Sequence, residues 1–66
     1  MNLDTRTLTQ RASDWLRSPQ NFAGCIHVEY IPVPNQAYFV MWCQQPLRIF
    51  NAKAEALEYV ADTFAS

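Results

Sequence analysis

The chain is poor in charge, in glycine and in cysteine, and it contains no long hydrophobic run. Charged residues make up 17% of its 66 residues, and the formal net charge is −1. Affinity for nucleic acid rises with clustered lysine and arginine, whose binding releases counterions from the phosphates. The basic side chains here are few and scattered, which disfavours a nucleic-acid partner.

Signals for membrane insertion and secretion are also missing. A membrane-spanning helix needs about 20 consecutive apolar residues, and no stretch of this sequence comes close to that length. The N-terminal residues 1–6 are mostly polar, unlike the apolar segment of a secretory signal. We therefore expect a cytoplasmic protein without a membrane partner.

Cys25 and Cys43 are the only cysteines. Two cysteines are too few for a disulfide scaffold, and cytosolic thiols are kept reduced. We therefore expect both to be free thiols. No stretch has the residue types and spacing of a known catalytic or cofactor-binding motif, so we expect a protein that is not an enzyme and that holds no cofactor.

Half of the residues are hydrophobic, which is typical of folded globular proteins and not of disordered chains. A chain of this length buries only roughly 60% of the surface that its unfolded form exposes. We expect one small α+β domain over residues 1–66, with a correspondingly small core.

The first element is predicted to be a helix over residues 3–17. Its apolar residues have the spacing of one helical face: Leu8, Ala12, Trp15 and Leu16. Asp4 can cap its first turn, with Leu3 closing on Leu8 as a hydrophobic staple. Ser18-Pro19 should end it, because proline lacks an amide hydrogen.

A loop over residues 20–24 should follow, with Phe22 against the core and Gly24 in a conformation closed to other residues. Alternating apolar residues then predict a strand over 25–31, and the uncharged run 37–43 predicts a central strand. Pro32 to Gln36 separates them as a hairpin loop. A short third strand is expected over 47–50.

The loop length sets an expected register. Ile31 would face Ala37, and His27 would face Met41 on one side of the sheet, with Cys25 beside Cys43. Tyr30–Tyr38, Val28–Val40 and Ile26–Trp42 would pair on the other side. The third strand would place Leu47 and Ile49 beside Cys43 and Met41, and Arg48 beside Trp42.

A second helix is predicted over residues 52–65, capped by Asn51. Its expected buried stripe comprises Ala54, Leu57, Val60, Ala61 and Phe64, and its expected solvent side carries Glu55, Glu58 and Asp62. The predicted fold is thus a helix, a three-stranded antiparallel meander and a helix, with both helices mainly on one face of the sheet.

The central strand is apolar on both sides, and two short helices hardly cover both faces of a sheet. An uncovered apolar patch is therefore expected, and such patches mark interaction sites. Cys25, Phe39, Met41, Cys43, Leu47 and Ile49 prefer the interior, so we expect the helices over their face. The opposite face carries Tyr30, Tyr38, Trp42 and Arg48, residue types enriched at interfaces, and these four are the predicted partner-binding residues.

The sequence favours a small protein that binds another protein or a second copy of itself, as an accessory subunit, adaptor or inhibitor. Two other functions stay open. Aromatic residues on a sheet can stack the bases of single-stranded nucleic acid. Cys25, His27, Met41 and Cys43 could cluster as soft metal ligands, or the two cysteines could have a redox role, although three good ligands are fewer than a structural zinc site needs.

Overall fold

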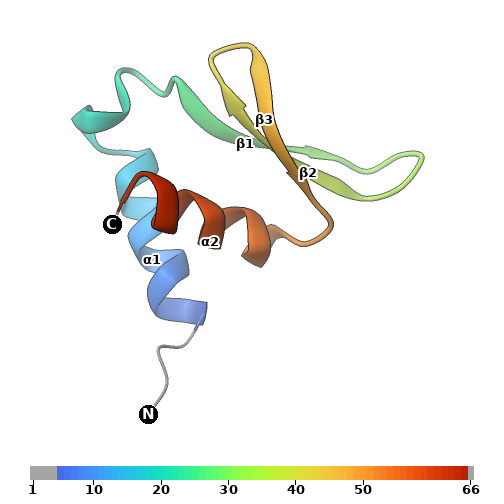
Figure 1. Cartoon of the computed structure of the whole chain (residues 1–66), viewed down its shortest axis with the longest axis horizontal. Helices are drawn as coiled ribbons and strands as arrows, with labels where there is room; N and C mark the ends of the chain where they lie inside the picture. Colours follow the sequence, from blue (N-terminus) through green and yellow to red (C-terminus); the bar gives the residue numbers. More distant parts are fainter. Residues whose placement is uncertain (1–4, 66) are drawn as a thin grey trace.

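The computed structural model describes residues 5–65, although not the side chains of the first two of these. The elements follow the order α1 (Thr5–Leu16), the 3-10 helix η1 (Pro19–Asn21), β1 (Ile26–Ile31), β2 (Ala37–Trp42), β3 (Gln45–Phe50) and α2 (Lys53–Thr63). The strands form one antiparallel sheet with β2 in the middle. The predicted α+β fold is confirmed, and Figure 1 shows both helices on one side of the sheet.

Helix α1 has the predicted apolar face, since Leu8, Trp15 and Leu16 pack against the core and Ala12 is fully buried. The helix ends at Leu16, before Ser18 and Pro19, as expected. The proposed cap at Asp4 and the staple from Leu3 lie outside the described residues.

The segment between α1 and β1 differs from the prediction. Phe22 was expected against the core, but it is 83% exposed, and the buried residue of this segment is Asn21. Phe22, Ala23 and Gly24 have positive φ values of 39°, 61° and 81°. This left-handed run turns the chain sharply, so that the Phe22 ring points to solvent while the Asn21 amide turns inward.

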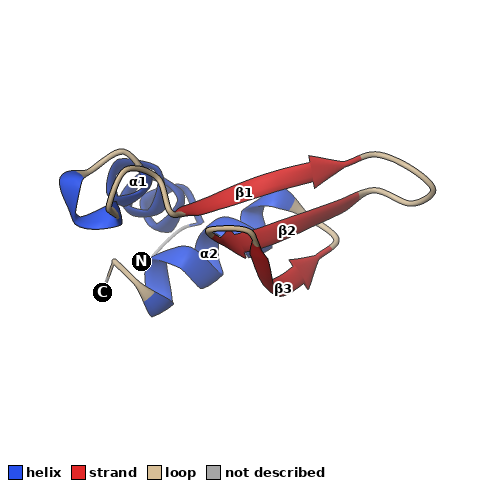
Figure 2. Ribbon diagram, turned by 90° about the horizontal axis from the view of Figure 1, so that it is seen from above, coloured by secondary structure: helices blue, strands red, loops and turns tan. Residues whose placement is uncertain are grey.

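The β1–β2 hairpin has the predicted register at every pair, from Ile31 opposite Ala37 to Ile26 opposite Trp42. A five-residue loop joins the strands and reaches away from the helices (Figure 1). Figure 2 shows β1 along one edge of the sheet and β3 along the other.

The predicted β3 register was wrong by two residues. The chain reverses through the two residues Cys43 and Gln44, so pairing begins with Trp42 opposite Gln45. Arg48 consequently lies opposite Val40 instead of Trp42. Between this pair and the Met41–Pro46 pair, β3 carries one additional residue, Leu47, as a β-bulge. A shift of two residues keeps side chains on their faces, so Arg48 stays on the predicted side.

Helix α2 begins one residue later than predicted. Ala52, not Asn51, is the N-cap residue, and none of the described side chains caps the helix. The Asn51 carbonyl instead accepts a hydrogen bond from the Gln36 side chain at 3.1 Å. Ala54 is exposed and Ala56 takes its expected place in the buried stripe. The acidic side, Glu55, Glu58 and Asp62, is exposed as predicted.

The helices cover the face of the sheet opposite to the one expected. Val40 is fully buried and packs with Ile26 and with Ala56, Val60 and Ala61 of α2. Val28, Tyr38 and Phe50 pack against the same core. The reason lies in β1, where the alternative would have buried His27 and Glu29, at a large cost in desolvation. The face that carries Phe39, Met41 and Ile49 is therefore the one that no helix of the described residues covers.

The two cysteines form a disulfide, contrary to the expectation of free thiols. Cys25 and Cys43 are joined across the ends of β1 and β2, with their Cα atoms 4.5 Å apart. The hairpin register sets them opposite each other, and the Cys43 N–H donates to the Cys25 carbonyl. Their proximity thus follows from the strand pairing itself.

Candidate protein-interaction surfaces

The four predicted partner-binding residues do not form one continuous surface. Tyr30 and Tyr38 are neighbours, with ring centroids 4.8 Å apart. Trp42 lies at the far end of β2, and the fully buried Val40 stands between it and Tyr38 on the same face. Because α2 packs across this face, only the two ends of the predicted surface reach solvent. Tyr30 is 50% and Trp42 53% exposed, whereas Tyr38 is half-buried against the core.

Arg48 belongs to a different cluster from the one predicted. Its guanidinium carbon lies 5.6 Å from the ring centroid of Phe50 and 5.5 Å from that of Tyr59. Such cation–π contacts hold the side chain against the β3–α2 junction. Arg48 therefore covers the rings of Phe50 and Tyr59, and it does not pair with Trp42, which lies opposite Gln45.

The side of the sheet that no helix of residues 5–65 covers carries a second apolar surface, here called the outer sheet face. It comprises His27, Glu29 and Ile31 of β1, Phe39 and Met41 of β2, and Pro46 and Ile49 of β3. Phe39 and Met41 are half-buried at its centre, while Ile49 is 58% exposed. A shallow hollow of about 190 Å³ lies among Glu29, Ile31, Phe39, Met41 and Pro46.

Polar groups on the outer sheet face are confined to the β1 margin. His27 Nε2 lies 3.3 Å from Glu29 Oε2, and both side chains are about half exposed. Both side chains belong to β1, and the outer-face residues of β2 and β3 are apolar. The face thus combines an apolar centre with one polar margin, the arrangement usual in protein interfaces.

The disulfide removes two ligands from the metal-binding alternative. The sulfur atoms of Cys25 and Cys43 are bonded to each other, and a metal ligand must be a free thiolate. Within residues 5–65, no group of three or more His, Cys, Asp or Glu side chains is arranged to hold a metal ion. A Cys–His catalytic pair would need the same thiolate.

One hollow lies at the β2–β3 turn. Its volume is about 410 Å³, and it is lined by Trp42, Cys43, Gln44 and Gln45. All four are consecutive residues of one turn, so no second element fixes its shape. A second hollow, of about 340 Å³, is built from three elements, α1, β1 and α2, and is a better candidate site.

Asn21 is the structurally important residue that the sequence reading missed. Its side chain is 2% exposed and makes three hydrogen bonds of 2.9 Å. The amide nitrogen donates to the Leu16 and Ile26 carbonyls, and the amide oxygen accepts from the Ile26 N–H. Asparagine between a proline and a glycine usually marks a turn, and this signal does not distinguish an exposed from a buried amide.

Comparison with protein-family models, with curated proteins and with solved structures gave no match for this chain. Neither helix within residues 5–65 is long and apolar enough to span a membrane. The structure defines a small α+β protein with one disulfide, and its function has to be argued from its surfaces.

Proposed function

We propose that this chain is a small non-enzymatic protein-interaction domain, an accessory subunit, adaptor or inhibitor, and that its outer sheet face contacts another protein. The observation that carries this proposal is the apolar centre of that face, where Phe39, Met41 and Ile49 lie side by side without a helix over them. Contiguous apolar patches on soluble proteins commonly mark binding sites.

The size of the face favours a partner protein over a second copy stacked face to face. Three strands of six residues give a sheet surface of about 300 Å², from strand spacings of about 4.8 Å and a rise of about 3.4 Å per residue. A stable interface buries about 800 Å² on each partner. Two outer sheet faces alone therefore fall well short, and the partner has to extend beyond the sheet.

Residues at both ends of the sheet can supply additional contact area. Tyr30 and Trp42 are each about half exposed and combine a large apolar surface with a polar group. Trp42→Ala is expected to weaken the same complex while the fold persists. Tyr38→Ala is a poorer probe, because Tyr38 packs against the core.

Site-specific cross-linking in the native host tests the proposal. A photoreactive amino acid at Ile49 should give one discrete protein adduct, and Ile49→Glu should prevent binding of that protein in a purified assay. The same photoreactive residue at Ala54 is the matched control, because Ala54 is exposed and α2 packs on the opposite side of the sheet from the outer sheet face. No discrete adduct at Ile49, with a protein that stays monomeric in light scattering, would contradict the proposed function.

The cellular compartment is a separate question. The sequence led us to expect the cytoplasm, but the Cys25–Cys43 bond fits an oxidising compartment better, because cytosolic thiols are kept reduced. Rapid alkylation of host cells, followed by mass spectrometry of the two cysteines, separates these cases. Cytoplasmic residence predicts two alkylated thiols.

A further inference from the structure

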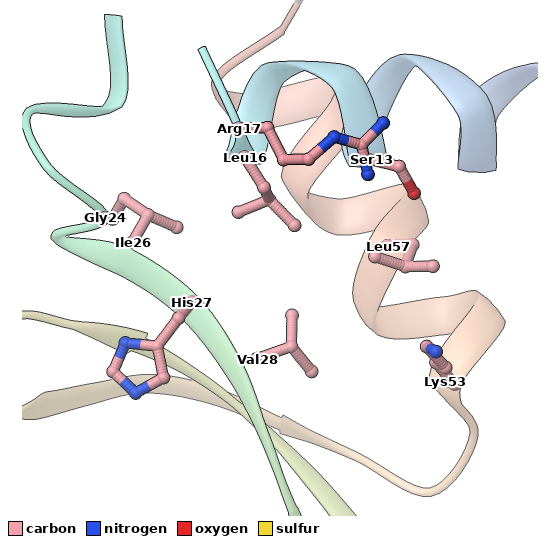
Figure 3. A pocket seen from close by; sticks show the side chains of 9 residues that line it. All are labelled: Ser13, Leu16, Arg17, Gly24, Ile26, His27, Val28, Lys53 and Leu57. Atoms are coloured by element: carbon pink, nitrogen blue, oxygen red, sulfur yellow. The ribbon is translucent and has the colours of Figure 1, made fainter. Parts of the chain in front are cut away.

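A cleft separates β1 from the helices. It has a volume of about 340 Å³ and is lined by Ser13, Leu16, Arg17, Gly24, Ile26, His27, Val28, Lys53 and Leu57. It exists because α1 packs mainly against α2, while α2 packs on β2 and β3. The inner side of β1 is therefore only partly covered. Figure 3 shows Val28 and Leu57 facing each other across this space, with the His27 ring turned to the other side of β1.

The lining of the cleft is apolar with a cationic margin. Leu16, Ile26, Val28 and Leu57 form its walls, and the charged side chains among the lining residues are Arg17 and Lys53. Arg17 forms an ion pair with Asp14 at 3.1 Å, but both side chains are largely exposed. Such exposed ion pairs contribute little to stability, so Arg17 can contact a ligand instead. None of the described residues that line the cleft is acidic, so its charge suits an apolar group joined to a carboxylate.

The backbone of β1 beside the cleft is an open strand edge. Ile26 directs its N–H and C=O away from β2, since both bond to the Asn21 side chain. Backbone groups alternate in direction along an antiparallel strand, so Val28 and Tyr30 also direct theirs outward. Within residues 5–65, β1 is the last strand on this side of the sheet, and no strand meets these four groups.

The opposite edge of the sheet is protected in a way that β1 is not. β3 contains Pro46, which has no amide hydrogen, and a bulge at Leu47. Proline and bulges are the usual devices that prevent strand addition at an edge. β1 is regular over Ile26–Ile31 and contains neither device.

We propose that the cleft and the β1 edge form a binding site for an extended peptide segment of another protein. The segment adds to β1 as a fourth strand through hydrogen bonds to Val28 and Tyr30. It places an apolar side chain in the cleft and a carboxylate near Lys53 and Arg17. Backbone pairing supplies affinity and the cleft supplies selectivity, as in other cases of strand addition. This site is distinct from the outer sheet face.

A second copy of the chain fits the edge poorly. Antiparallel self-pairing that uses Val28 and Tyr30 of both copies places Glu29 directly opposite Glu29, which is unfavourable. Shifting the pairing to centre on Val28 brings His27 opposite Glu29, but then Tyr30 must bond to Ile26, whose outward groups Asn21 already occupies. Both registers are thus obstructed, which favours a strand of different sequence.

Binding is tested with blocked seven-residue peptides in which valine, isoleucine or phenylalanine alternates with threonine and one residue is glutamate. Titrated into the ¹⁵N-labelled protein, at least one should give saturable shifts at the Val28, Tyr30 and Lys53 amides. No saturable binding by any peptide up to about 1 mM, or shifts clustered at Phe39, Met41 and Ile49, would overturn the proposal. The latter result would leave the proposed function intact.

Modified peptides test strand addition without altering the protein. N-methylation of alternate residues on the pairing edge should weaken binding at least tenfold, because it removes backbone donors and blocks close approach. The same modification on the other edge should change it less than twofold. Equal effects of the two modifications would show that the peptide does not bind as a strand.

Two matched variants test whether binding requires a cation at the cleft. Lys53→Gln and Ala54→Glu each lower the net charge by one, and only the first removes a cation from the cleft. Lys53→Gln should weaken binding of the glutamate peptide about threefold, which is the range for an exposed ion pair. It should leave binding of the matching glutamine peptide unchanged. Ala54→Glu should change neither by more than twofold. Equal effects of both variants, or stronger binding of sodium dodecanoate than of any peptide at the same amides, would contradict the proposal.

Discussion

Replacing Asn21 by alanine is expected to destabilise the fold more than any other single polar substitution discussed above. The Asn21 side chain joins two elements, since it bonds to the Leu16 carbonyl at the end of α1 and to both backbone groups of Ile26 at the start of β1. Helix C-termini leave carbonyl groups without intrahelical partners, and the edge of β1 has the same need. One buried amide satisfies both.

The magnitude follows from the three hydrogen bonds. Each contributes a net of about 1 kcal/mol, so Asn21→Ala should lower the free energy of unfolding by about 3 kcal/mol. A domain of this length is stable by roughly 3–10 kcal/mol in total, so the loss is a large fraction. Asn21→Asp should be at least as damaging, because it preserves side-chain shape but replaces the donating NH₂ group by an oxygen directed at two carbonyls.

Urea unfolding of the oxidised protein, followed by far-UV circular dichroism, measures the effect. Gln20→Ala is the control, because Gln20 is an exposed amide in the same 3-10 helix and should change stability by less than about 0.5 kcal/mol. Hydrogen exchange adds a local measurement, since the Ile26 amide should lose protection first. If Asn21→Ala is as stable as Gln20→Ala, or Asn21→Asp as stable as the wild type, the role assigned to this amide is wrong.

Three further predictions test the fold. The double variant Cys25→Ser, Cys43→Ser opens a loop with a sequence separation of 18 residues and should lose about 3 kcal/mol of stability in urea unfolding, with the reduced wild type giving the same result. Phe64→Ala removes a ring that stacks at 5.2 Å on an aromatic ring of α1 and should cost about 2 kcal/mol, whereas Phe22→Ala, at an exposed ring, should cost less than about 0.5 kcal/mol; equal costs would contradict the core assignment. Ala23→Gly relieves a φ of 61° and should raise the melting temperature by a few degrees, corresponding to about 1 kcal/mol; a lower melting temperature would argue against strain at this residue.

The β1–β2 hairpin could be predicted fully from the sequence because its loop length leaves little choice. Five residues between Ile31 and Ala37 set the register, and the register then places Cys25 opposite Cys43. The expectation of free thiols was nevertheless wrong, because it followed from a cytoplasmic location, in which thiols are kept reduced. The strand pairing already contained the geometric information.

The prediction of which sheet face the helices cover was wrong, although the sequence contains the pattern that decides it. Residue types on β2 favoured burial of Phe39 and Met41, while the alternation on β1 favoured burial of Ile26 and Val28. The second pattern decides, because desolvation of His27 and Glu29 costs more than exposure of apolar atoms. Val40 and the alanines of α2 also belong to one buried cluster, and larger side chains at these positions would increase the separation of helix and sheet.

Other features could not be read from local sequence. The burial of Asn21 depends on contacts with α1 and β1 that form only in the folded chain. The cleft depends on how the two helices divide the sheet between them, because α1 packs on α2 and leaves β1 partly uncovered. Neither hydrophobic periodicity nor turn residues specify such an arrangement, since both patterns are equally compatible with α1 lying directly on β1.

The two proposed surfaces have one structural cause. Two short helices on one side of a three-stranded sheet leave the other side uncovered. Because α2 packs on β2 and β3, the edge of β1 is also left uncovered. A strand added to β1 would widen the outer sheet face by about 4.8 Å and bring the remainder of its protein beside that face. The contact area missing from the outer sheet face alone can thus come from the same partner that occupies the edge. A single partner that uses both surfaces would bury the apolar face and pair with the open strand edge, both of which residues 5–65 leave uncovered.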